Sequence, residues 1–172
     1  MSDPIPTDWQ ARIDALWARF DAFTPAEFLA SMTALAAEGP ADDPHVLFEL
    51  ASALDSTDHE AQAETLYRRA LDHGLSGPSR RRATIQLAST LRNLSRAEEA
   101  VTLLTAERTQ PSDDLDDAVA AFLGLCLADL GREREAFSLA LTALAPHLPR
   151  YNRSLRNYAA ALIMSQDKSD RD

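Results

Sequence analysis

Thiols, lysines and long apolar runs are scarce in this sequence. Cys126 is the single cysteine among 172 residues, so no disulfide can form within the chain, and a reducing cytoplasm is the expected location. The first residues, MSDPIPTDW, contain neither a basic region nor an apolar run, which argues against a secretory signal. No stretch approaches the roughly 18 consecutive apolar residues of a membrane-spanning helix. We therefore expect no membrane association.

Motifs for catalysis and for metal or cofactor binding are also missing. The sequence contains no glycine-rich phosphate loop and no G-x-S-x-G turn. The segment HEAQA begins like a zinc-protease helix but has Ala63 where the second histidine is required. Cys126 lies in an apolar stretch with no basic neighbour, which indicates a buried thiol rather than a nucleophile. We predict no catalytic residue, no metal and no cofactor; an all-α enzyme without a recognised motif is the less favoured alternative.

Negative charge predominates but is unevenly distributed. The formal charge of −10 at pH 7 disfavours binding to nucleic acids or to anionic membranes. Residues 76–110 and 150–172 nevertheless carry +3 and +2, whereas residues 111–149 carry −5. Lys168 is the only lysine, and the use of arginine together with abundant alanine is typical of a high-GC bacterial coding bias. The two basic segments are therefore candidates for contact with a partner.

Helical periodicity is the main pattern that is present. Apolar residues recur with a period of 3.6 and hardly ever alternate, so we predict an all-α protein. About nine helices are expected, near residues 8–22, 25–38, 45–56, 59–73, 79–93, 96–108, 114–130, 133–145 and 151–165. Several starts match S/T-x-x-E/Q, a pattern that predicts reciprocal capping bonds, at Thr7, Thr24, Thr57 and Ser95.

Three segments share one arrangement of leucines and small residues. They are residues 47–71, 84–108 and 121–144. In each, a leucine precedes a small residue, a second leucine follows three residues later, and an alanine lies nine residues beyond that. The leading leucines, at 50, 87 and 123, are 37 and 36 residues apart. This repetition predicts three similar helix pairs.

Two glycines in the third segment have a place in this arrangement. Gly124 is the small residue after the leading leucine, and we predict that it lets its helix approach Ala136 on the partner helix. Gly131 falls at the turn between the helices, where a left-handed conformation favours glycine.

The spacing L-[G/A]-x2-L-x8-A-x6-A resembles the tetratricopeptide repeat family, whose period is about 34 residues. The resemblance implies a right-handed superhelical stack of antiparallel helix pairs, an α-solenoid. It divides the chain into an N-terminal helical pair or cap (1–43), three repeats within 44–149 (about 44–77, 81–113 and 117–149), a C-terminal capping helix (150–165) and a disordered tail (166–172). In the N-terminal pair we expect a buried stripe of Trp9, Ile13, Leu16, Trp17 and Phe20.

The family also implies a function. Its members are non-catalytic binding modules whose first helices line a concave groove for a peptide or protein segment. Carrying these positions over predicts the following groove residues: Phe48, Ser52, Arg82, Ile85, Ser89, Arg92, Asn93, Leu125, Arg153, Arg156 and Asn157. Ala121 and Ala128 of the third repeat are expected in the groove as well, together with Ala160 and Ile163 of the capping helix.

Arginines beside an apolar strip would favour an acidic segment or a free C-terminus. Some tetratricopeptide domains hold the terminal carboxylate of a chaperone with a specific set of Lys, Asn and Arg residues. The matching positions of this sequence carry other residues, so binding of a chaperone tail is not implied. Two alternatives remain open: the arginines pair with the acidic residues at 113–117, or exposed apolar surface forms a homodimer.

Overall fold

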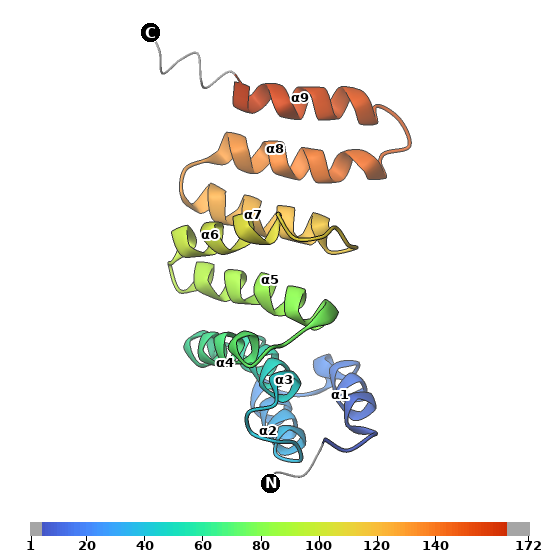
Figure 1. Cartoon of the computed structure of the whole chain (residues 1–172), viewed down its shortest axis with the longest axis vertical. Coiled ribbons are helices and arrows are strands. Elements are labelled where there is room, and N and C mark those ends of the chain that lie inside the picture. The colour runs from blue at the N-terminus through green and yellow to red at the C-terminus, as the bar shows by residue number, and fades with distance from the viewer. Residues whose placement is uncertain (1–4, 165–172) are drawn as a thin grey trace. The chain divides into compact units, whose positions relative to one another are not determined.

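The structure is a computed structural model that describes residues 5–164 (Figure 1). Over these residues the chain forms nine α-helices and no strand, which confirms the all-α prediction. The helices are α1 (Trp9–Trp17), α2 (Pro25–Ala36), α3 (Pro44–Asp55), α4 (Glu60–Asp72), α5 (Gly77–Asn93), α6 (Ala97–Glu107), α7 (Asp116–Asp129), α8 (Glu133–Leu144) and α9 (Asn152–Met164). The predicted first helix is shorter than expected, because the chain passes into a 3₁₀ helix at Phe20–Ala22. The predicted tail lies outside the described residues.

The chain divides into two units, Met1–Leu94 and Ser95–Asp172, here called unit 1 and unit 2. Unit 1 contains α1–α5, and each of its helices packs on the next, with α3 also packing on α5. In unit 2, α6 packs on α7, α7 on α8 and α8 on α9. None of the helices in the described part of the chain is long and apolar enough to cross a bilayer.

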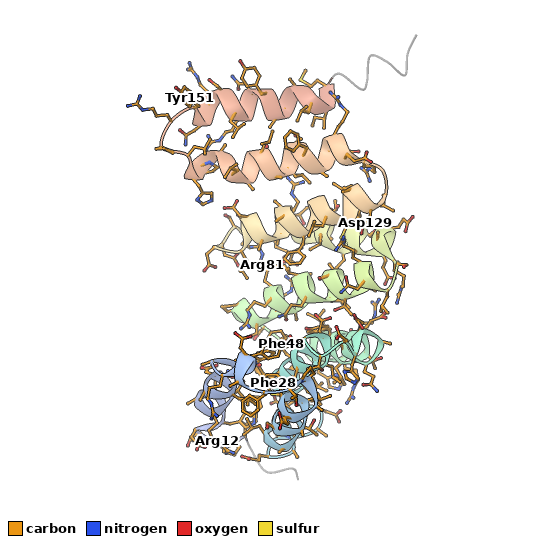
Figure 2. All side chains as sticks on the ribbon, turned by 180° about the vertical axis from the view of Figure 1, so that it is seen from behind. Arg12, Phe28, Phe48, Arg81, Asp129 and Tyr151 are labelled. Atoms are coloured by element: carbon orange, nitrogen blue, oxygen red, sulfur yellow. The ribbon has the colours of Figure 1, made fainter. Side chains whose placement is uncertain are left out.

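Aromatic side chains form the core at the start of unit 1. Phe28 of α2 is fully buried, and its ring lies 4.8 Å from Trp17, 4.7 Å from Phe20 and 6.3 Å from Phe23 between centroids. Figure 2 labels Phe28 among the helices of this unit. Of the buried stripe predicted for the N-terminal pair, Trp9 and Ile13 are buried, whereas Leu16, Trp17 and Phe20 are half-buried and pack against the same core.

The turns within the helix pairs repeat one backbone conformation. Asp58, Ser95 and Gly131 have φ angles of 62°, 60° and 71°, in the left-handed region. The three positions are 37 and 36 residues apart, the same intervals as those between the leading leucines. The predicted left-handed residue at Gly131 is thus confirmed, and the other two turns carry non-glycine residues at the same point.

Helix capping follows the sequence prediction at only one of the four candidate positions. The Thr24 hydroxyl accepts a bond from the Glu27 N–H at 3.3 Å, and the Glu27 carboxylate accepts one from the Thr24 N–H at 2.9 Å. The boxes predicted at Thr7, Thr57 and Ser95 are wrong. Their helices begin later, after the cap residues Asp8, His59 and Arg96, none of which makes a side-chain cap bond.

Candidate functional site

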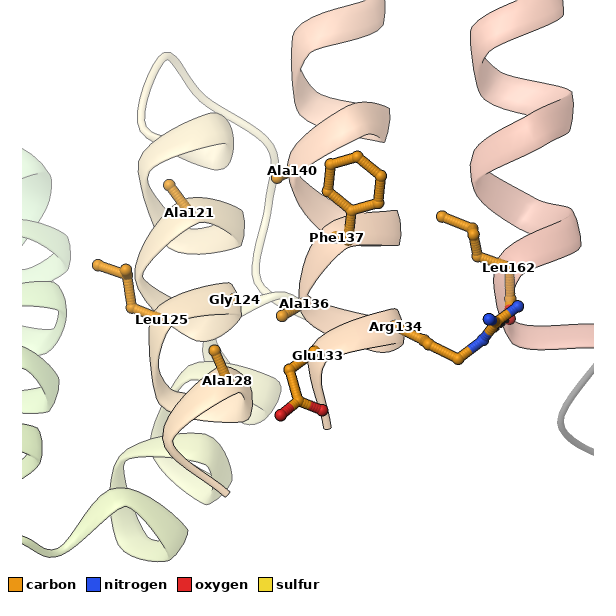
Figure 3. Close-up of a pocket in the computed structure, with 10 residues that line it drawn as sticks. All are labelled: Ala121, Gly124, Leu125, Ala128, Glu133, Arg134, Ala136, Phe137, Ala140 and Leu162. Atoms are coloured by element: carbon orange, nitrogen blue, oxygen red, sulfur yellow. Dashed lines mark hydrogen bonds between the residues drawn. The ribbon is translucent and has the colours of Figure 1, made fainter. Parts of the chain in front are cut away.

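An apolar groove of about 790 Å³ lies on one face of unit 2, where α7, α8 and α9 meet (Figure 3). Its apolar lining comprises Ala121, Gly124, Leu125, Ala128, Ala136, Phe137, Ala140 and Leu162. Glu133 and Arg134, at the start of α8, complete it. Figure 3 shows Phe137 and Leu162 directed toward one another between α8 and α9, with Ala121 on α7 and Ala140 on α8. We call this feature the unit 2 groove.

Close packing of α7 on α8 sets the depth of the groove. A Cβ atom on Gly124 would lie 3.3 Å from the carbonyl oxygen of Ala136, so the absence of a side chain lets the two backbones approach. This contact confirms the role predicted for Gly124. Because the floor is made of glycine and alanine, the space above it is not filled by the protein's own side chains.

Hydrogen bonds between α9 and the chain segment of α8 and the turn after it hold the two helices together. The Arg134 guanidinium donates to the Leu162 carbonyl at 3.0 Å, near the C-terminal end of α9, where a cation interacts favourably with the helix dipole. The Ser138 hydroxyl donates to the Ala159 carbonyl at 2.7 Å, and the Asn152 amide donates to the Ala145 carbonyl at 2.7 Å. These three bonds fix the antiparallel register of α8 and α9 and so place Leu162 opposite Phe137.

Large apolar side chains of the groove are open to solvent. Phe137 is 56% exposed and Leu125 is 45% exposed. A partner that covered this surface would gain about 25 cal/mol of binding free energy for each Å² of apolar area removed from water. A contiguous exposed apolar surface of this kind is typical of a binding site for a protein.

The groove residues predicted in unit 1 lie in a different environment. Phe48, Ser52 and Ile85 are buried, with Phe48 only 1% exposed, so none of them offers an open wall. The Arg82 guanidinium lies over the Phe48 ring, 5.2 Å from its centroid, in a cation–π contact.

A polar face on α5 remains accessible in unit 1. Arg82 and Asn93 are exposed and Ser89 is half-buried. With Gln86 they follow the spacing i, i+4, i+7, i+11, which places all four side chains on one side of the helix. Gln86 accepts a hydrogen bond from the Ser52 hydroxyl at 3.2 Å, which joins this face to α3. Arg92, the remaining prediction on α5, is half-buried.

The arginines predicted on α9 do not share the unit 2 groove. Leu162 is the α9 residue that lines it, whereas Ala160 and Ile163 line a second depression, of about 420 Å³. That depression lies against the opposite face of α8, so the expected placement of Ala160 and Ile163 beside Leu125 is wrong. Arg156 precedes them by four and seven residues and therefore lies on their side of α9.

The exposed residues Arg153 and Asn157 likewise contribute nothing to the groove lining. The predicted groove residues found there are Ala121, Leu125 and Ala128, all on α7. Phe137 and Ala140, on a second helix, were missed because the prediction considers first helices alone. For Ala140 the sequence contains a signal. Its counterpart in the first repeat, 73 positions earlier, is the bulky Tyr67, so the third repeat has a small residue where the first has an aromatic one.

Unit 1 also contains a buried carboxylate, that of Glu49 on α3. The Trp17 indole N–H donates to Glu49 Oε2 at 2.8 Å, which links the N-terminal pair to α3. Burial raises the pKa of Glu49 above its ordinary value and outweighs the opposing effects of the Trp17 bond and of the Arg82 charge.

Replacement of Glu49 by glutamine should change the pH dependence of stability. Because the native state holds the Glu49 proton more tightly than the unfolded chain, its stabilising effect is complete below the unfolded pKa of about 4.3 and is lost as pH rises through the higher native pKa. Glutamine keeps an oxygen acceptor for Trp17 and does not titrate. We expect the free energy of unfolding of Glu49→Gln, relative to wild type, to increase from about pH 4 to about pH 7. Urea denaturation followed by tryptophan fluorescence measures it; a pH-independent difference would contradict the assignment.

Comparison with known proteins agrees with the repeat seen in the helices. The family model described as tetratrico peptide repeat matches residues 44–162. Among solved structures, MamA 41-end from Desulfovibrio magneticus RS-1 is similar with a TM-score of 0.61 and 17% identity, over 97% of this chain and 97% of that one. An ArsTM double mutant of MamA RS-1 gives the same TM-score and identity, over 96% and 98%. No curated protein matches the sequence. Since the family model covers more than half of its residues, the chain belongs to the tetratricopeptide repeat family.

Proposed function

We propose that this protein is a non-catalytic interaction module that holds an apolar segment of a partner protein in the unit 2 groove. The family membership supports a protein–protein interaction scaffold in general. The observation that supports this particular site is the exposure of Phe137 and Leu125 along a groove whose floor consists of glycine and alanine. A segment lying there would cover both side chains and would gain the burial energy that the isolated unit forgoes.

The chemistry of the lining favours binding over catalysis. Its titratable members are Glu133, which is exposed, and Arg134, which is engaged with the carbonyl end of α9. The remaining lining residues are apolar and supply neither a nucleophile nor a general base. The groove therefore suits recognition through shape and burial.

Replacement of Phe137 by serine should weaken capture of the partner without loss of fold. The side chain is exposed, so the change in the free energy of unfolding should be within about 0.5 kcal/mol. Truncating a central aromatic contact of an interface typically costs about 2 kcal/mol or more, about thirtyfold in affinity. Wild type and variant would be compared by affinity capture from lysate with quantitative mass spectrometry.

Tyr151→Ser is the matched control for this experiment. Tyr151 is also aromatic and is 76% exposed, but it does not line the groove. Proteins captured by wild type and by Tyr151→Ser, yet lost with Phe137→Ser, are partners of the groove. Equal capture by all three proteins would contradict the proposed site.

A second candidate function is the binding of an acidic segment or a free C-terminus on the polar face of α5. The observation in its favour is the position of Arg82, which is exposed while its guanidinium is held over the Phe48 ring. A planar guanidinium fixed in this way could bond a carboxylate through two parallel N–H groups. Capture that fails with Arg82→Glu and persists with Phe137→Ser would favour this face over the groove.

Self-assembly is the remaining alternative for the exposed apolar surface. Besides the groove, unit 2 exposes Tyr151, Tyr158 and Met164. A homodimer built on these residues would dissociate on dilution, and light scattering over a concentration series would detect it. A mass that stays at one chain throughout would rule out this alternative over that concentration range.

A further inference from the structure

The unit 2 groove occupies a position that two aromatic rings fill in the first repeat. Residues of the first and third repeats correspond at a constant offset of 73, as the pairs Leu50 and Leu123 or Ala63 and Ala136 show. In the first repeat, Phe48 of α3 and Tyr67 of α4 are buried with ring centroids 6.4 Å apart. We call these two residues the aromatic pair.

Both members of the aromatic pair are alanine in the third repeat. At the offset of 73, Phe48 corresponds to Ala121 and Tyr67 corresponds to Ala140, and both alanines line the groove. Figure 3 shows Ala121 on α7 and Ala140 on the neighbouring helix α8. The groove is therefore the volume that remains when an aromatic pair is removed from an otherwise similar helix pair.

The surroundings of this volume favour an aromatic ring without a buried hydroxyl. In the first repeat the Tyr67 hydroxyl lies 3.5 Å from the Ser52 hydroxyl. The counterpart of Ser52 is Leu125, so the polar partner is replaced by an aliphatic side chain. Phe137 adds a ring on the same side of α8, where a second ring could pack against it in an edge or offset arrangement.

Charge around the groove favours a basic segment. Residues 111–149, which contain α7 and α8, carry a formal charge of −5. Glu133 lines the groove and is exposed, and Asp129 is exposed at the nearby end of α7. The Arg134 guanidinium is directed at the end of α9, where it bonds the Leu162 carbonyl. Lys or Arg residues beside the bound ring would complement this rim.

We propose that the unit 2 groove recognises a protein segment through one phenylalanine or tryptophan side chain flanked by lysine or arginine. The ring occupies the space between Ala121, Ala140 and Phe137. This inference rests on the proposed function and specifies the chemistry of its partner.

Selection from random peptides tests the inference even though the partner protein is not identified. The probe is a library of random 12-residue peptides displayed on phage and selected on the full chain. We expect the enriched peptides to contain a phenylalanine or tryptophan with a lysine or arginine within three positions. Replacing that aromatic residue by leucine in a synthetic copy should weaken binding at least tenfold.

Variants that fill the groove make the test specific to this site. Ala121→Phe with Ala140→Tyr rebuilds the aromatic pair of the first repeat and should reduce peptide affinity at least tenfold while the helical circular dichroism is kept. Should that double variant fail to fold, Ala140→Leu introduces the residue that the second repeat has there, Leu104. Ala106→Tyr, at an exposed site that lines neither depression, is the control and should bind normally.

Each outcome separates the inference from the proposed function. Peptides that lack an aromatic residue or carry acidic flanks, yet are lost with Phe137→Ser and with the filled variant, overturn the inference and leave the groove as a binding site. If no enriched peptide depends on Phe137 or Ala140, both are overturned. Aromatic, basic peptides that the filled variant no longer binds support both.

Discussion

Replacement of Phe28 by alanine lowers the free energy of unfolding by about 3–5 kcal/mol, the range for removal of a buried phenylalanine. Its ring lies at the centre of the aromatic cluster of unit 1, with three other rings within 6.3 Å between centroids. Alanine would leave a cavity that the rigid rings around it cannot close. Pairwise ring contacts, worth roughly 0.5–1.5 kcal/mol each beyond burial, are lost at the same time.

Urea denaturation followed by tryptophan fluorescence measures this effect, because both tryptophans, Trp9 and Trp17, belong to the same cluster. With a slope of about 2 kcal/mol per molar urea, the midpoint should fall by about 2 M. Phe28→Leu, which keeps most of the volume, should cost less than about 1.5 kcal/mol. Equal midpoints for the wild type and Phe28→Ala would show that the cluster does not support unit 1.

Replacement of Gly124 by leucine destabilises unit 2 by about 3 kcal/mol, at the upper end of the cost of overpacking. The atom nearest to a new Cβ is a backbone oxygen, that of Ala136, at 3.3 Å. A backbone atom cannot rotate away, so a branched side chain forces α7 and α8 apart. The same change also fills part of the unit 2 groove.

Gly124→Ala is the control, and we expect it to be nearly neutral. The corresponding residues of the other repeats, Ala51 and Ala88, are alanines that are fully buried. The close contact with Ala136 opposes the gain in helix propensity, which is about 1 kcal/mol. Urea unfolding of the three proteins, followed by circular dichroism, compares them. A leucine variant as stable as the alanine variant would contradict the close approach of α7 and α8.

The repeat is accessible from the sequence because local rules determine it. The intervals between Leu50, Leu87 and Leu123 are the same as the intervals between the residues with left-handed backbone at the turns. Gly131 is predicted correctly since a helix end with positive φ favours glycine. Ser95, by contrast, matches a capping pattern, although its backbone takes the left-handed conformation of the turn. The pattern S/T-x-x-E/Q does not distinguish these two roles.

The position of the groove is harder to predict, because it depends on pairs of side chains from different helices. Phe48 occupies a first-helix position that the family resemblance assigns to the groove, yet Tyr67 from α4 packs beside it and both are buried. At the same position in the third repeat, Ala121 meets Ala140 and the space stays open. Comparison of the repeats with each other, rather than with a family pattern, identifies this difference.

Site-specific photo-crosslinking in cells tests the central claim, that a partner segment lies in the unit 2 groove, most directly. A photoreactive phenylalanine analogue would replace either Ala128, which lines the groove, or Ala106, which lies outside it. The account predicts crosslinked partner proteins from position 128 and not from position 106, and loss of those crosslinks when Ala140→Tyr is added. Identical crosslinks from both positions, or crosslinks at 128 that persist with Ala140→Tyr, would contradict it.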